Sequence, residues 1–179
     1  DRFNYEQVYE NQIIDASHPP FYYGLVHIVC SLFPNQFSRY FAFSINVLAM
    51  AGILIMLFKI VKRITKNNLY ALIATGAFAF SIACTTMTIY LRMYATLTFF
   101  VLSMIYMNLK IFERKNTAKF TDFLILGLIT LLGTLTQYYF ILFEGLTGLI
   151  MLVFQIKERN IKDLIKYIIT AVLGSAAAL

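Results

Sequence analysis

Charged residues are scarce in this sequence. Asp, Glu, Lys and Arg make up 13% of its 179 residues, whereas soluble domains carry about 25%. Hydrophobic residues make up 60%, and the mean hydropathy is +0.72. The shortage of charge excludes an ordinary soluble domain and indicates that the chain is surrounded by lipid.

Cysteine and proline are also scarce. Cys30 and Cys84 stand in apolar stretches without the Cys or His spacing of a metal site, which excludes a disulfide framework and a zinc centre. The three prolines lie outside the long uncharged runs. The helix-breaking pattern of many transporters is therefore not expected here.

Both ends of the sequence look cut. No signal peptide opens the chain, the first 15 residues are polar, and Leu179 lies inside an apolar run. We therefore expect the N-terminal fragment of a larger membrane protein.

The uncharged runs predict an all-α, polytopic transmembrane helix bundle. A spanning helix needs about 20 apolar residues. Pro19–Phe33 is too short to span, and its Pro-Pro start suits a first helical turn, so it is expected to lie at the membrane interface after an extracytoplasmic loop at 1–18. Transmembrane helices are expected at 38–58, 68–90, 93–112, 121–138, 140–156 and 164–179.

Basic residues predict the orientation of these helices. Twelve of the 15 Lys and Arg residues stand in three loops, each separated from the next by two expected spans. The positive-inside rule places these loops in the cytoplasm. The net charge of +6 thus needs no nucleic acid. The basic loops contain Lys59, Lys62, Arg63 and Lys66; Lys110, Arg114, Lys115 and Lys119; and Lys157, Arg159, Lys162 and Lys166.

With this orientation, polar residues from three regions meet on the outer side. They are Asp15 and His18, then Arg92, then Gln137 with Tyr138 and Tyr139. Outer loops over a cavity between helices are a usual way to build a membrane enzyme's site.

Each candidate also has a structural interpretation. Asp15 could favour the start of a helix, His18 could be an exposed loop residue, and Arg92 could reach lipid headgroups. Glu144, about one turn deeper, is either a hydrated cavity acid or a structural hydrogen-bond partner. The outer tyrosines could form an interfacial aromatic belt, and these are Tyr90, Tyr94, Tyr138 and Tyr139.

Three segments together resemble a known family. Residues 15–27, Asp-Ala-Ser-His-Pro-Pro-Phe-Tyr-Tyr followed by His27, are similar to the D-x-HPPLYYxxLH signature of bacterial membrane glycosyltransferases. Leu91–Ala95 resembles the family's A-R-M-Y-A segment, and Thr136–Phe140 resembles its T-H-Y-Y-F segment. These enzymes form the protein O-mannosyltransferase and aminoarabinose transferase-like superfamily, with the GT-C fold.

The chain departs from the family pattern at two places. Gln137 stands where the family has His, so a metal or phosphate role of that His does not carry over. The spacing between Asp15 and His18 is longer than usual. The resemblance also implies that the main catalytic acid precedes Asp1, so this fragment alone is not expected to catalyse.

The resemblance implies an inverting transfer of a sugar from a polyprenyl-phosphate donor to a lipid, glycan or protein acceptor outside a bacterial cell membrane. Asp15 and His18 would be catalytic or hold a divalent metal, and Arg92 with Tyr94 would bind the donor phosphate. Gln137, Tyr138 and Glu144 would line the cavity. No other cofactor is implied. A lipid or solute transporter and a non-enzymatic membrane protein remain as alternatives.

The predicted topology can be tested by labelling. Cysteines introduced at Asn4 and Asn35, with Cys30 and Cys84 replaced by serine, should react with an impermeant thiol reagent in intact cells because they lie outside. A cysteine at Asn116 should react only after the cells are permeabilised. Labelling at position 116 in intact cells would reverse the orientation.

Overall fold

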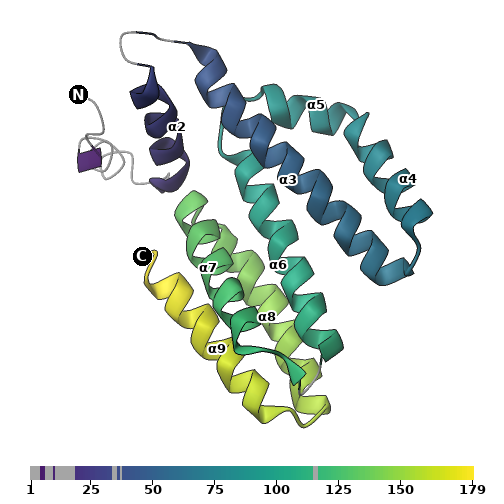
Figure 1. Cartoon of the computed structure of the whole chain (residues 1–179). Coiled ribbons are helices and arrows are strands. Elements are labelled where there is room, and N and C mark those ends of the chain that lie inside the picture. Colours follow the sequence, from purple (N-terminus) through teal and green to yellow (C-terminus); the bar gives the residue numbers. More distant parts are fainter. Residues whose placement is uncertain (1–4, 7–9, 11–18, 34–35, 37, 115–116) are drawn as a thin grey trace. The chain divides into compact units, whose positions relative to one another are not determined.

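The computed structural model describes residues 5–6, 10, 19–33, 36, 38–114 and 117–179. These residues form helices joined by short connections, and no strand occurs among them (Figure 1). The predicted all-α class is confirmed. Asp15 and His18 lie outside the described residues. The chain divides into two compact units, Asp1–Phe99 and Phe100–Leu179.

The first unit is built on one long helix. α3, Arg39–Thr65, packs against α2, Phe21–Leu32, and against α4, Asn68–Ala79, and α5, Ile82–Ile89 (Figure 1). At 1.5 Å per residue its 27 residues extend about 40 Å, enough to cross an apolar core of about 30 Å. Lys66, the residue that follows α3, has the left-handed conformation and ends the helix.

The segment expected as one helix at 68–90 is broken in the structure. α4 and α5 meet at an angle of 57°, although no proline or glycine stands at the break. Ser81 instead caps α5. Its hydroxyl accepts the Cys84 N–H at 3.2 Å and donates to the Phe78 carbonyl at 2.6 Å. Because a serine side chain can replace the helical hydrogen-bond partners, the two helices part here.

The second unit contains α6 from Phe100 onward, α7, α8 and α9 (Figure 1). α7, α8 and α9 pack against one another, and α6 contacts α8 through the rings of Phe112 and Phe154. Basic and acidic side chains join α6 to α7: Asp122 in the first turn of α7 pairs with Lys110 at 2.8 Å and with Arg114. The helices are α6, Tyr94–Arg114; α7, Phe120–Thr136; α8, Phe140–Lys157; and α9, Ile161–Ala176.

Apolar side chains cover the outside of this unit while polar ones are buried. Thr130 and Thr134 of α7 are fully buried. Large residues on one stripe of α8 are exposed instead, which suits contact with lipid. The stripe consists of Leu142, Leu146, Leu149, Val153 and Ile156.

Three of the described helices are long and apolar enough to cross a membrane, and α4 with α5 makes up to four if the bent pair is one span. They are α3, α6 and α8. α7 is apolar but has 17 residues, and α2 has 12. The predicted number of six spans and the interfacial position of α2 stay predictions.

Two glycines allow α7 and α9 to approach closely. A Cβ added to Gly174 would lie 2.7 Å from the Gly127 carbonyl oxygen. This distance is shorter than van der Waals contact, and the obstacle is backbone rather than a flexible side chain. Small residues at such crossings are typical of helix packing in membranes.

Gly174→Ala should therefore lower the stability of the second unit by about 1–3 kcal/mol through overpacking. The control is Gly145→Ala on α8, where an added Cβ meets nothing within 4 Å; its effect should stay within about 1 kcal/mol. Thermal melting of the intact protein in mild detergent measures both. Equal melting temperatures for the two variants would contradict the close crossing.

Candidate functional site

The Pro-Pro segment leads directly into a buried tyrosine. Pro19 is fully buried, α2 begins two residues later, and Tyr22 in its first turn is buried as well. Tyr22 clusters with Ile45 of α3 and Met93, which precedes α6. We call residues 15–27, Leu91–Ala95 and Thr136–Phe140 the three landmark segments. The structure brings Tyr22 of the first and Met93 of the second together within the first unit.

Asn46 of α3 connects Tyr22 of the Pro-Pro segment to the residues just before Leu91–Ala95 through hydrogen bonds. It is fully buried, with 0% of its surface exposed. Its side-chain amide donates to the Tyr90 carbonyl at 2.7 Å and to the Thr88 carbonyl at 3.3 Å, and its oxygen accepts the Tyr22 hydroxyl at 3.4 Å. One amide side chain therefore holds α2, α3 and the end of α5.

Tyr22 is suited to this donor role because it stays neutral. Burial, with the neighbouring Tyr23 as a smaller cause, raises the pKa of Tyr22 to about 12. The phenol therefore keeps its proton across the physiological range, as the bond to the Asn46 oxygen requires.

The Leu91–Ala95 segment separates buried from exposed side chains. Met93 and Ala95 are buried, whereas Arg92 and Tyr94 are exposed. The Arg92 N–H donates to the Tyr90 carbonyl at 2.7 Å, and the rings of Tyr90 and Tyr94 stack with centroids 5.8 Å apart. The backbone at Arg92 is thus held by the same carbonyl that Asn46 binds.

The Arg92 guanidinium is available to a ligand. Among the described residues, none makes a side-chain hydrogen bond or an ion pair with it, and its side chain is exposed. A guanidinium on a fixed backbone, with no carboxylate of the described residues paired to it, suits an anion that two parallel N–H groups can bind.

The third landmark segment forms the turn between α7 and α8 in the second unit. Phe140 is buried against Gly133, where an added Cβ would lie 2.6 Å from the Phe140 ring. Tyr138 is exposed, and Tyr139 is 72% exposed. The Gln137 side-chain oxygen is buried and has no partner among the described atoms.

Glu144 lies between helices of the second unit. It is 7% exposed, and its carboxylate accepts the Ser175 hydroxyl of α9 at 2.6 Å. Of the two sequence interpretations, this contact supports a structural hydrogen-bond partner. Its partner Ser175 directly follows Gly174, the residue at which α9 closely approaches α7.

His27 lies in α2, and its ring is nearly perpendicular to the Tyr5 ring, the centroids being 5.2 Å apart. In the part of the chain that the structure describes, no group of three or more His, Cys, Asp or Glu side chains could hold a metal ion. The metal prediction named Asp15 and His18, which fall outside that part.

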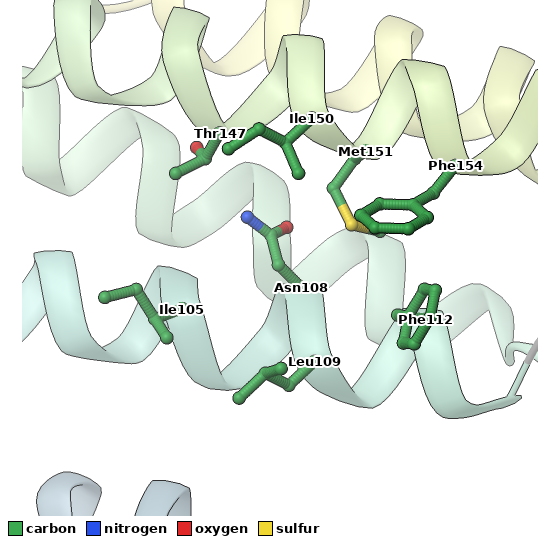
Figure 2. A pocket seen from close by; sticks show the side chains of 8 residues that line it. All are labelled: Ile105, Asn108, Leu109, Phe112, Thr147, Ile150, Met151 and Phe154. Atoms are coloured by element: carbon green, nitrogen blue, oxygen red, sulfur yellow. The ribbon is translucent and has the colours of Figure 1, made fainter. Parts of the chain in front are cut away.

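A separate cavity of about 310 Å³ lies between α6 and α8 in the second unit (Figure 2). It lies toward the Arg114 and Lys157 ends of these helices, away from the Gln137 turn. Its polar groups are Asn108 and Thr147, and its other lining residues are Ile105, Leu109, Phe112, Ile150, Met151 and Phe154. An apolar cavity of this kind does not resemble a site for charged chemistry.

Comparison with known proteins identifies the family. The family model described as dolichyl-phosphate-mannose-protein mannosyltransferase matches residues 17–179. The chain belongs to this family. No curated protein and no solved structure matches the chain. Membership makes the chain part of a family of membrane glycosyltransferases, in agreement with the resemblance of the three segments.

Sequence reasoning missed Asn46 within this mannosyltransferase-family chain. It stands in the uncharged run Tyr40–Phe58, and an asparagine in an apolar helix was a signal that could have been followed. Polar side chains inside membrane helices usually find partners on neighbouring helices.

Asn46→Leu should destabilise the first unit by about 1–3 kcal/mol, because the Thr88 carbonyl and the Tyr22 hydroxyl lose their hydrogen bonds to Asn46 and the Tyr90 carbonyl keeps only the Arg92 N–H. The control is Ser44→Ala, since that exposed hydroxyl bonds only within its own helix, to the Phe41 carbonyl at 2.7 Å. Thermal melting of the intact protein measures both. In a double-mutant cycle, the changes in stability caused by Asn46→Leu and Tyr22→Phe should not add up, because the two side chains share a hydrogen bond. Additive changes would contradict the shared network.

Proposed function

We propose that this protein transfers a sugar from a polyprenyl-phosphate donor to a hydroxyl acceptor on the extracytoplasmic side of the membrane, with inversion at the anomeric carbon. The observation that carries the proposal is Arg92: an exposed guanidinium, unpaired among the described residues, on a backbone anchored through the Tyr90 carbonyl to Asn46. Family membership supports a glycosyltransferase.

The proposed reaction needs a base and a cation. The acceptor oxygen attacks the anomeric carbon from the face opposite the phosphate, and a carboxylate takes the hydroxyl proton. The bond between that carbon and the phosphate oxygen breaks, and the oxygen leaves with the electron pair. Arg92 would stabilise the negative charge that grows on the leaving phosphate.

Fixed geometry is what makes Arg92 suitable for this step. A donor group stabilises a transition state most when it needs no rearrangement as the charge develops. Asn46 and the turn at Tyr90 supply such a support. Tyr94 begins α6 beside Arg92, and its ring stacks on Tyr90, so its hydroxyl is proposed as a second phosphate contact.

The other site residues belong to the same proposal. Asp15 is the candidate base among residues 1–179, and His18 would orient it or share a divalent metal with it. Gln137 and Tyr138 are proposed as cavity residues of the outer turn, in line with the unpartnered Gln137 oxygen. Glu144 would stabilise that region through Ser175.

The proposal that the site faces the extracytoplasmic side is based on the distribution of basic residues. The three basic loops favour the cytoplasm by the positive-inside rule, and Arg92 falls on the opposite side of the expected spans. A bacterial cell membrane is the proposed location, from the resemblance of the Asp15–His27 segment.

Arg92→Ala should lower sugar transfer by about 10²–10³-fold, the usual effect of removing a group that binds a developing anion. Arg92→Lys should recover only part of the rate, because a point charge does not reproduce a planar fork. The assay is transfer from a polyprenyl-phosphate sugar by the intact protein, over a range of donor concentrations.

The control is Lys62→Ala, which removes a positive charge from the last turn of α3. This variant should keep the wild-type rate. Each variant must first melt as the wild type does. If a folded Arg92→Ala protein transfers sugar at the wild-type rate, Arg92 anchors the protein to headgroups and does not bind the donor phosphate.

A further inference from the structure

The first unit has a pocket beside the segment that carries Arg92. Its volume is about 340 Å³, and it lies between the first turn of α3 and the connection from α5 to α6. Its walls are almost entirely apolar or aromatic. They are formed by Arg39, Tyr40, Phe43, Ile89 and Leu91.

Arg39 places one positive charge in this apolar pocket. Its guanidinium carbon lies 5.6 Å from the centroid of the Tyr40 ring. No ion pair joins Arg39 to a carboxylate in the part of the chain that the structure describes. The pocket therefore combines apolar walls with a cation that none of the described carboxylates neutralises.

The pocket is accessible from outside the unit. Tyr40 and Ile89 are more than half exposed, and Leu91 is exposed as well. Arg39 and Leu91 flank the predicted outer ends of their helices, close to the expected headgroup level. A ligand could therefore enter sideways from the bilayer with its chains still in lipid.

We propose that this pocket binds an anionic glycerophospholipid, with its phosphate on Arg39 and the first carbons of its chains on Phe43, Ile89 and Leu91. A guanidinium pairs well with a phosphate, and the walls bury methylene groups. The apolar walls offer no hydrogen-bond partners for hydroxyl groups, so the part of the headgroup beyond the phosphate has to lie in water. The lipid site does not use Arg92 and goes beyond the proposed transfer reaction.

Tryptophan fluorescence can test this site, since the sequence contains no tryptophan. Tyr40→Trp puts a reporter in the pocket and keeps an aromatic ring beside Arg39. In detergent, phosphatidylglycerol with brominated acyl chains should quench this emission, after subtraction of the unsubstituted protein's signal. Brominated diacylglycerol, which lacks the phosphate, should quench only at much higher concentration.

Arg39→Gln in the Tyr40→Trp background should raise the half-quenching concentration of phosphatidylglycerol about tenfold or more, as expected for loss of a charge-assisted hydrogen bond. The matched control is Lys62→Gln. That lysine also lies over an aromatic ring of α3, with its nitrogen 6.0 Å from the Phe58 centroid, but far along the helix. The control should leave the quenching curve unchanged.

Three outcomes would overturn the assignment. They are equal quenching by diacylglycerol, no effect of Arg39→Gln, and displacement of the brominated lipid by a lower concentration of decaprenyl phosphate than of phosphatidylglycerol. The last would assign the pocket to the carrier lipid. Because no sugar is transferred in these measurements, they are independent of the Arg92 experiment.

Discussion

The buried amide of Asn46 is the contact on which the arrangement of the first unit depends. α5 ends at Ile89, so the helix itself supplies no N–H donors to the carbonyls of its last turn. In an apolar environment an unpaired carbonyl is costly. The two amide hydrogens of Asn46 bind the Thr88 and Tyr90 carbonyls, and its oxygen accepts from Tyr22.

This contact has a consequence for the candidate site. Tyr22 belongs to the Pro-Pro segment, and Tyr90 stands two residues before Arg92. A helix end that needs hydrogen-bond partners is thus converted into a support for an exposed arginine. In the proposed function, the hydrogen bonds that stabilise the first unit would also position Arg92 for the donor phosphate. The second unit uses different means: glycines bring α7 and α9 together, and Glu144 bonds Ser175 between α8 and α9.

Much of the fold could be predicted because hydropathy adds up along a chain. The long apolar runs of α3, α6 and α8 show directly which segments suit a bilayer. The break between α4 and α5 could not be predicted this way, because Ser81 is compatible both with an unbroken helix and with a cap. Its extended conformation follows from the hydrogen bonds that it makes with Phe78 and Cys84.

The sequence by itself determined the membrane class, the family and the candidate residues, since composition and short motifs are local properties. Only the tertiary structure decided which of those residues have partners. It gave Glu144 a hydroxyl from Ser175, left the Arg92 guanidinium without a described partner, and showed that Asn46 joins Tyr22 to Tyr90. The physical reason is that the cost of a buried polar group depends on which donors and acceptors neighbouring helices place beside it, and no single segment contains that information.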